Sequence, residues 1–510
     1  MTNHARKASL AVFVTSALTV SGCAGGSGGH SANTDSLAIA TLSVPQSFDP
    51  TTAIGSTLPF FQTVYDTLLK REPDGTYSPM LATTWELDAT RTQLRLTLRE
   101  GVKFADGTPF DAAAAKANLD RFKATQGSNT RWFNDLDAVD VVDGTHVNLK
   151  LKQPNPAMLY YLSDAAGLMA NPARFAQPDS LKGAPDGTGP YTLDKGKTVI
   201  GTKWAYERKT DYWGAPLPYK SVSISVFDNE TAIVNGVKTG QIDAALLQLA
   251  DQQIGIESDN RIKAVKQEFD FQGILLFDRD GKITPQLKDP RVRQAINLAV
   301  DRATMVSQLR QGRGTATAQV FGPTSPGYKP ELDSYYAHDP AKAKALLAEA
   351  GHPDGFTLKL PRVATIVNDA LAASLQTDLK AVGINLVWEQ VEPTKAIDRI
   401  IRGREFSGMV MNLGQSSNDW VIANDLVSPG PFNIFGTTDP TVQDLLAKLK
   451  TETGDQEKAA AQALNRHLVE NAWFVPFYRM TYLHVSDGSV EIAPQDGMAV
   501  PSIYNYKPAK

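Results

Sequence analysis

A single cysteine constrains this chain more than any other feature. Cys23 is the one cysteine among 510 residues, so no disulfide can form within the chain and packing alone has to stabilise it. A chain of this length is expected to form roughly two to four domains. Cys23 ends a segment in which Arg6 and Lys7 precede an apolar run, residues 8–20, and two small residues. That order predicts a secretory signal peptide over residues 1–22. A membrane-spanning helix is not expected here, because the run is shorter than the roughly 20 apolar residues that such a helix needs.

The last residues of this segment, Val20-Ser21-Gly22-Cys23, resemble a bacterial lipobox. The resemblance implies cleavage before Cys23, lipidation of its thiol and anchoring to the cell membrane on the extracytoplasmic (periplasmic) side. The Gly/Ser-rich residues 23–36 bury too little surface to order themselves, so they are predicted to form a flexible tether. The alternative is an ordinary exported chain in which the cysteine is incidental.

Composition and motifs argue against several functional classes. The 55 acidic residues slightly outnumber the 51 basic ones, and no basic block appears, which argues against nucleic acid as a partner. The seven histidines show no metal-ligand spacing. Gly196-Lys197-Thr198 lacks the upstream glycine of a phosphate-binding loop, because that position is Tyr191. Since no nucleophile motif is present either, we expect no catalytic residues, no cofactor and no bound metal.

The spacing of apolar residues predicts an α/β chain. Residues 94–99 and 222–227 alternate apolar with polar side chains, as half-buried strands do. Strands and helices interleave irregularly, which favours mixed sheets. Apolar spacing, capping residues and glycine stops predict helices over Thr57–Leu69, Ala112–Phe122 with Asp111 as its cap, Glu230–Gly240, Arg291–Leu309 and Ala370–Val382.

Several short blocks along residues 37–482 share a pattern with a known family. They are Tyr65-Asp66-Thr67-Leu68-Leu69, Leu81-Ala82-Thr83-Thr84-Trp85, the stretch from Leu98 to Pro109, Gly187-Thr188-Gly189-Pro190-Tyr191, Asp211-Tyr212-Trp213-Gly214, Gly240-Gln241-Ile242-Asp243-Ala244 and the stretch from Asp289 to Ile296. In this order they resemble the bacterial extracellular solute-binding proteins of family 5, the peptide- and nickel-binding subunits of ABC importers. The resemblance covers nearly the whole mature chain.

The resemblance implies a two-lobed α/β fold of the periplasmic-binding-protein type (type II), with an extra domain inserted in the first lobe. A hinge would close the lobes over the ligand. The implied boundaries are 37–70, 186–270 and 485–510 for lobe I, 71–185 for the inserted domain and 271–484 for lobe II. The chain would be a monomer and not an enzyme, and it would capture a small solute, above all a short peptide, for delivery to an ABC permease.

The resemblance also indicates residues that would hold the charged ends of a peptide. Arg362 precedes the helix Ala370–Val382, where dipeptide-binding members carry the arginine that binds the ligand carboxylate. Asp419, in Gly414-Gln415-Ser416-Ser417-Asn418-Asp419-Trp420, matches the loop aspartate that binds the ligand amine. This loop departs from the family pattern, since Trp420 stands where proline is common and Asn418 where glycine is common. Further candidate ligand contacts are Trp420, Asn418, Ser417, Phe48 and Ser56.

Other interpretations remain open at this point. Arg362 can be a solvated charge at a strand end, and Asp419 can be a helix cap. The same scaffold can hold a chelated metal, haem, a sugar, an opine or another amine instead of a peptide. The chain can also be a sensory or chaperone-like lipoprotein without a permease, or a secreted hydrolase.

Overall fold

The computed structural model describes residues 35–510, except 126, 128, 178 and 431. The predicted signal peptide, Cys23 and most of the predicted tether lie outside these residues. Contacts between Cα atoms join Thr34–Lys510 into one compact unit. Within the described residues, no helix has both the length and the apolar character needed to cross a membrane.

The largest sheet of the described residues has nine strands and is mixed. Its order is β16 (Gly408–Gly414), β12 (Lys263–Leu276), β17 (Phe474–Ser486), β11 (Ala244–Leu247), β1 (Ser36–Thr41), β10 (Ser221–Val226), β9 (Lys203–Arg208) and β8 (Tyr191–Leu193), with β13 (Gly314–Ala316) paired to β17. β1 lies between β10 and β11 and is parallel to both. The carboxyl ends of these three strands therefore meet at one edge of the sheet.

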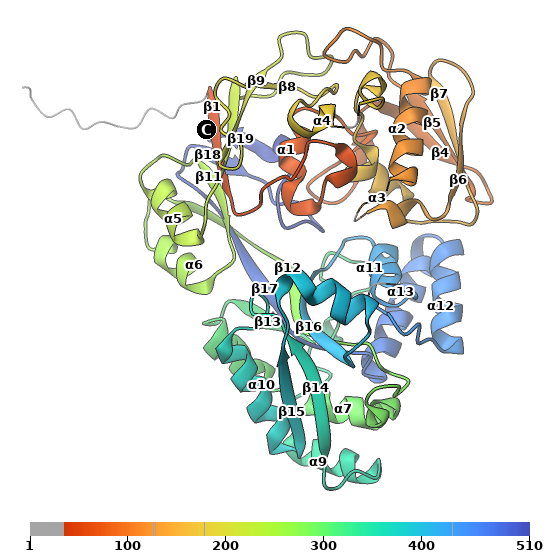
Figure 1. Ribbon diagram of the computed structural model, residues 1–510, viewed down its shortest axis with the longest axis vertical. Helices are drawn as coiled ribbons and strands as arrows, with labels where there is room; N and C mark the ends of the chain where they lie inside the picture. Colours follow the sequence, from red (N-terminus) through yellow and green to blue (C-terminus); the bar gives the residue numbers. More distant parts are fainter. Residues whose placement is uncertain (1–34, 126, 128, 178, 431) are drawn as a thin grey trace, which may run out of the picture. The chain divides into compact units, whose positions relative to one another are not determined.

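Two long strands connect the two halves of this unit. β12 and β17 are antiparallel partners, and both run from the region of β1 to the helices α7 (Pro290–Ala299) and α10 (Asp369–Ala381), as Figure 1 shows. Their register shifts between Glu268 and Phe271, which marks a bulge where the strands pass between the halves. We call residues 35–262 with 487–510 the first lobe, and residues 277–473 the second lobe. The domain boundaries drawn from the sequence remain a prediction.

A four-stranded antiparallel sheet lies in the first lobe, inside the predicted insertion. Its order is β4 (Ala82–Leu87), β5 (Gln93–Leu98), β7 (His146–Leu151) and β6 (Leu136–Val141), and α2 (Ala112–Ala124) contacts β6 and β7. Asp111 caps α2 as predicted, because its carboxylate accepts the N–H of Ala114 at 2.9 Å. The other elements of this lobe are β2 (Leu69–Arg71), β3 (Tyr77–Pro79), β18 (Val490–Ile492), β19 (Tyr506–Pro508), α1 (Leu58–Gln62), α3 (Met158–Leu162), α4 (Ser180–Gly183), α5 (Glu230–Lys238) and α6 (Ala250–Glu257).

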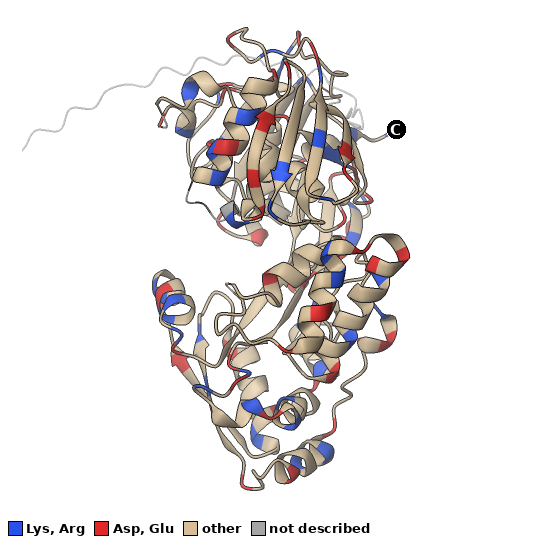
Figure 2. Cartoon of the chain, turned by 90° about the vertical axis from the view of Figure 1, so that its right-hand side faces the viewer, with Lys and Arg blue, Asp and Glu red and all other residues tan. Residues whose placement is uncertain are grey.

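The second lobe is built around its own core. Apolar residues of β12 and β17, such as Ile274 and Phe477, pack with Leu358 and Leu375 from β14 and α10. Its other elements are β14 (Phe356–Arg362), β15 (Ile384–Gln390), α8 (Arg302–Thr304), α9 (Pro340–Glu349), α11 (Asp419–Leu426), α12 (Pro440–Thr451) and α13 (Gly454–Glu470). In the view of Figure 2, basic and acidic residues are interspersed over both lobes.

Two predicted helices are shorter than expected. The helix predicted over Thr57–Leu69 is only α1, because Asp66 turns into the core and accepts hydrogen bonds from Thr188, Tyr212, Trp213 and Tyr504. The helix predicted over Arg291–Leu309 ends with α7 at Ala299. The chain then breaks, which lets the buried guanidinium of Arg302 donate to the carbonyls of Asn297, Thr317 and Pro476.

Candidate ligand-binding site

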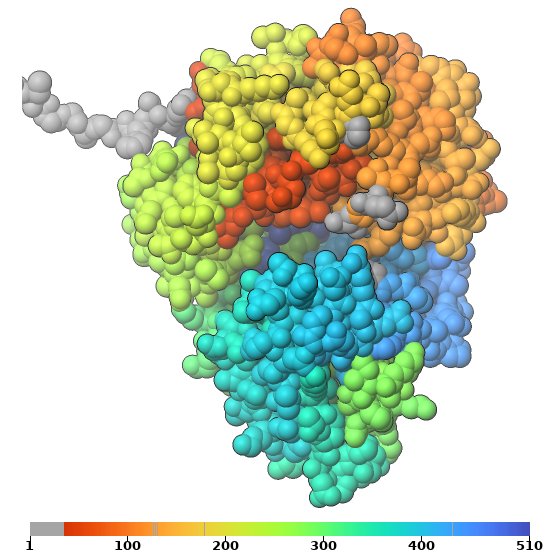
Figure 3. All heavy atoms as spheres, viewed as in Figure 1, coloured from red at the N-terminus to blue at the C-terminus, as the bar shows by residue number. Residues whose placement is uncertain are grey.

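A hollow lies between the two lobes, as Figure 3 shows. Its first-lobe side is bordered by the segments coloured red and yellow-green, and its second-lobe side by the segment coloured cyan. The same first-lobe segments line a cavity of about 90 Å³ that reaches residues of β1, β10 and β11. Since ligands of open α/β sheets bind outside the carboxyl ends of the strands, this hollow is the candidate site.

Of the two predicted first-lobe contacts, only Ser56 lines the cavity. Ser56 is half-buried and borders it together with Leu42, which is exposed. Phe48 lies in the core instead, where its ring packs 5.9 Å from the ring of Phe61. The carbonyl of Phe48 accepts the hydroxyl of Tyr65 at 2.8 Å, which holds this residue in the first-lobe core.

Asp419 is the first residue of α11 on the second-lobe side. The helix cap is its neighbour Asn418, whose Oδ1 accepts the N–H of Val421 at 3.1 Å. The side chain of Asp419 is buried, and its Oδ1 accepts hydrogen bonds from the hydroxyl of Ser325 and from the N–H of Gly327. Burial raises the pKa of Asp419, while these two hydrogen bonds favour the ionised form. Among the described residues, no lysine or arginine pairs with this carboxylate.

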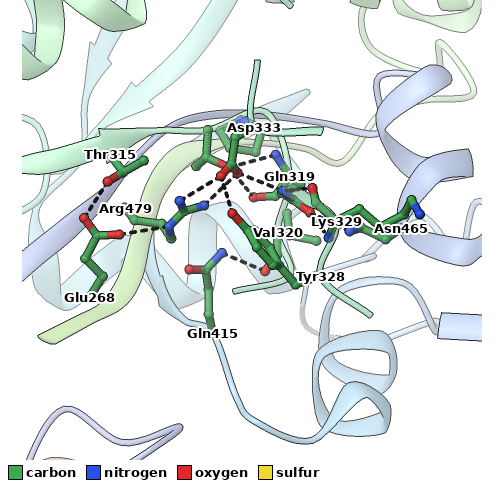
Figure 4. Close-up of polar contacts among 12 residues, drawn as sticks. Glu268, Thr315, Gln319, Val320, Tyr328, Lys329, Asp333, Gln415, Asn465 and Arg479 are labelled. Atoms are coloured by element: carbon green, nitrogen blue, oxygen red, sulfur yellow. Dashed lines mark hydrogen bonds and ion pairs between the residues drawn. The ribbon is translucent and has the colours of Figure 1, made fainter. Parts of the chain in front are cut away.

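The segment that holds Asp419, residues 319–333, is fixed in turn by Arg479 of β17 (Figure 4). The buried guanidinium of Arg479 binds both oxygens of Asp333, at 2.7 and 2.8 Å, and its Nε donates to Glu268 at 3.1 Å. Burial opposes ionisation of Asp333, but the hydrogen bonds and charge of Arg479 hold its pKa below the usual value. Bidentate pairs of this kind are among the strong polar contacts in proteins.

Three further hydrogen bonds in Figure 4 extend this network to the loop before α11. Tyr328 donates to Asp333 at 2.6 Å, and the amide of Gln319 donates to the same carboxylate at 2.8 Å. The amide of Gln415 donates to the carbonyl of Val320 at 3.1 Å. One polar network therefore joins the strands between the lobes to the loop that carries Asp419.

Ser417 makes a close contact with the first lobe. A Cβ placed on Gly497 would lie 2.7 Å from the nitrogen of Ser417, and a Cβ on Gly75 would lie 3.2 Å from its Oγ. Both glycines have positive φ, 72° and 83°, which other residues rarely adopt. The loop before α11 thus contacts the first lobe at two turns that require glycine.

Trp420 and Asn418 face the predicted insertion. Trp420 is buried and lines a different cavity, of about 380 Å³, together with Arg131. The amide of Asn418 donates to the carbonyl of Pro156 at 3.4 Å. Beside them, Arg131 forms an ion pair with Asp425 of α11 at 2.8 Å, so α11 contacts both lobes.

Arg362 ends β14, which lies beside β16. Its Nε donates to the carbonyl of Val367 at 3.2 Å, and its Nη2 pairs with the exposed Asp369. The amide of Gln272 donates to the carbonyl of Ile366 at 3.4 Å, which fixes the loop after β14 against β12. Arg362 therefore ends one strand of the second lobe, and Asp419 begins the helix that follows β16, a strand in contact with it.

Sequence patterns did not indicate Glu230 and His484, although both line the 90 Å³ cavity. The carboxylate of Glu230 accepts the N–H groups of Gln248 at 2.8 Å and Leu249 at 3.0 Å. Burial lowers the pKa of His484 to about 4, so its imidazole is neutral at pH 7. In the sequence, Glu230 has the pattern of an ordinary first-turn helix acid and His484 that of a strand residue, so no signal distinguishes them. Among the described residues, no group of three His, Cys, Asp or Glu side chains is arranged to hold a metal ion.

Comparisons with known proteins agree with this architecture. The structure of HbpA2 from Haemophilus parasuis covers 93% of this chain and 100% of its own, with a TM-score of 0.80 and 22% identity. The periplasmic binding protein DppA from Helicobacter pylori, in complex with the peptide STSA, covers 93% and 98%, with a TM-score of 0.79 and 21% identity. These likenesses confirm the two-lobed periplasmic-binding-protein fold predicted from the sequence.

Sequence comparison identifies the family. The glutathione-binding protein GsiB of Escherichia coli K12 is 28% identical over 419 residues, which are 77% of this chain and 79% of that protein. Residues 76–426 match the model of bacterial extracellular solute-binding proteins, family 5 Middle. The family model describes extracellular solute-binding proteins, and the Helicobacter pylori protein is an ABC transporter-associated periplasmic binding protein. Relatives that bind solutes agree with the prediction that the chain is not an enzyme. The chain belongs to the bacterial extracellular solute-binding proteins of family 5.

Proposed function

We propose that this protein captures a short peptide in the hollow between its lobes and delivers it to an ABC permease, while Cys23 anchors it to the cell membrane. In this proposal the second lobe binds both charged ends of the peptide. Closure of the lobes excludes water and strengthens these polar contacts.

The observation that carries the proposal is the state of Asp419. Its carboxylate is buried at the first turn of a helix, yet no cation of the described residues pairs with it. Both hydrogen bonds that it accepts end on Oδ1, which leaves Oδ2 for a ligand amine. A buried carboxylate without a cationic partner is costly, and an ammonium group from the ligand would supply that partner.

Arg362 supplies the complementary donor. Its contacts with Val367 and Asp369 use Nε and Nη2, which leaves Nη1 for a ligand carboxylate. The names of relatives support a peptide-like ligand, since GsiB is named for glutathione binding and the Helicobacter pylori protein was solved with a peptide.

Thermal unfolding of the soluble form that starts after Cys23 tests this function. The panel contains di- to pentapeptides, glutathione, amino acids, sugars, haem and nickel chelates. A ligand at 100 times its dissociation constant should stabilise the fold by about 2.7 kcal/mol. Stabilisation by peptides that disappears in Asp419→Asn and Arg362→Ala supports the proposal. Stabilisation by a non-peptide alone would keep the scaffold assignment and overturn the peptide.

Membrane anchoring and the permease need separate tests. Cys23→Ala should release the protein from the membrane fraction of cells, whereas the wild type should remain there. Loss of peptide uptake in cells without this protein, restored by the wild type, would support delivery to a permease. Normal uptake would favour a sensory or chaperone-like role.

A further inference from the structure

We infer that the 90 Å³ cavity of the first lobe is a side-chain subsite for an apolar stem that ends in a cationic group, with Glu230 as the acceptor. The inference rests on the proposed function, because it places one side chain of the captured ligand in this cavity. It assigns a ligand class that the charged ends of a peptide do not determine.

The cavity has the apolar lining that the stem of a long side chain requires. Its walls are largely apolar and come from β1, β10, β11, α1 and the C-terminal segment, among them Ile39, Phe60, Ile224 and Val500. Leu42, at its border, is 47% exposed, so the cavity reaches the surface of the first lobe. Methylene stems of lysine and arginine pack against apolar walls of this kind and leave the charged group at the end.

Glu230 gives this apolar cavity a negative end. The residue is 2% exposed, and each carboxylate oxygen accepts one backbone N–H, from Gln248 and Leu249. Each oxygen can accept a further hydrogen bond. Among the described residues, no lysine or arginine forms an ion pair with Glu230. A buried carboxylate with unused acceptor capacity favours a charged donor over a hydrocarbon group.

The ionisable side chains near Glu230 do not act as the charged hydrogen-bond donor to its carboxylate. Burial raises the pKa of Glu230, and the charge of the nearby Arg310 opposes this shift without cancelling it. However, its guanidinium donates to the carbonyls of Gln248 and Arg313, at 3.0 and 3.3 Å, and Arg310 does not line the cavity. His484 lines the cavity, but it is neutral at pH 7 and its Nε2 is bonded to Gln267 at 2.8 Å.

Two tripeptides that differ in one group test the subsite. Ala-Lys-Ala and Ala-norleucine-Ala have side chains with the same four-carbon stem, but only lysine ends in an ammonium. Isothermal titration calorimetry should show that the wild type prefers the lysine peptide by about 10- to 100-fold, the range of a hydrogen bond to a charged group. Glu230→Gln should lose this preference, while Glu207→Gln, on an acid of β9 whose side chain is 45% exposed, should keep it. The ratio of the two dissociation constants is measured within each variant. A disturbance of the loop at Gln248 that weakens both peptides equally therefore leaves this ratio unchanged.

The outcomes separate this inference from the proposed function. Asp419→Asn should weaken both peptides and keep their ratio. A wild type that binds the norleucine peptide as tightly, or a Glu230→Gln variant that keeps the preference, would overturn the subsite. If neither peptide binds, the proposed peptide function has failed, and thermal unfolding with hexylamine and hexanol tests the cavity alone. Stabilisation by hexylamine that requires Glu230 supports the inference, and equal effects of the two compounds overturn it.

Discussion

The two lobes hold the buried carboxylates of Glu230 and Asp419 by different means. Glu230, on the first lobe, is fixed by two backbone N–H groups of one loop. Asp419, on the second lobe, is fixed by Ser325 and Gly327. Ser325 and Gly327 belong to residues 319–333, which are fixed in turn by the Arg479–Asp333 pair.

This difference predicts that ligand binding by the two lobes responds differently to substitutions. Backbone donors at a strand end are set by the fold itself, so the first-lobe cavity should tolerate substitutions around it. A side-chain network loses several contacts when one member is removed, so the second-lobe wall should respond to substitutions far from the ligand. The predictions below test this contrast, beginning with the largest expected effect.

Replacement of Asp419 should have the largest effect. Asp419→Asn keeps an oxygen that can accept from Ser325 and Gly327 but removes the charge, so peptide affinity should fall by two orders of magnitude or more. That loss is about 2.7 kcal/mol or more, which lies within the roughly 2–5 kcal/mol of a broken, buried charge pair. Calorimetric titration measures it, and an unchanged affinity would show that Asp419 has only a structural role.

Asp270 should show the next largest effect, as a change in pH dependence. It lies opposite Gly414 at the end of β16, and burial raises its pKa from 3.8 to about 6 against the hydrogen bond from Tyr482. Because the folded state favours the protonated form, this group costs stability as the pH rises from about 4 to 6, and the cost is constant above that range. Asp270→Asn should therefore gain about 2–3 kcal/mol at pH 7.5 and nothing at pH 3.5.

Denaturant unfolding at both pH values measures the effect of Asp270→Asn. Asp140, whose side chain is 44% exposed, provides the matched control, and Asp140→Asn should change stability little at either pH. A loss of stability at pH 7.5 would mean that the ionised Asp270 stabilises the strands between the lobes.

Ser325 tests the indirect support of Asp419. Ser325→Ala removes one of the two hydrogen bonds that the carboxylate of Asp419 accepts. Peptide affinity should therefore fall about tenfold, near the 1–1.5 kcal/mol of such a bond. The exposed Ser307 is the control, because Ser307→Ala leaves this network intact. Equal affinities of the two variants would show that Gly327 alone positions the carboxylate.

The ion pair between the lobes should have the smallest effect. Arg131 and Asp425 are 30% and 23% exposed, so their pair is partly screened by solvent. Arg131→Ala should weaken peptide binding two- to fivefold through easier opening of the lobes, as expected for a pair worth about 0.5–1 kcal/mol. A double-mutant cycle with Asp425→Ala measures the coupling, and additive effects would contradict a role in closure.

The sequence predicted the parts of the fold that local rules control. Asp111 is a helix cap because the residues after it form a helix, and the cap chemistry is local. The break after Ala299 was not predictable, because it depends on Arg302 reaching the carbonyls of Thr317 and Pro476, which are distant in the sequence.

The same distinction holds for the candidate site. Asp419 is a candidate through its resemblance to a family loop and stays a prediction, and the sequence alone could not show that Asn418 is the cap. Glu230 was missed because its partners, the N–H groups of Gln248 and Leu249, lie in a loop beyond the next strand.

A cycle between the ligand amine and Asp419 tests the central claim most directly. Trialanine and N-acetyl-trialanine are titrated against the wild type and Asp419→Asn by calorimetry. We expect acetylation to weaken binding to the wild type by about two orders of magnitude and to have almost no effect on the variant, because both changes remove the same charge pair. Equal losses on acetylation in both proteins would show that Asp419 does not bind the amine.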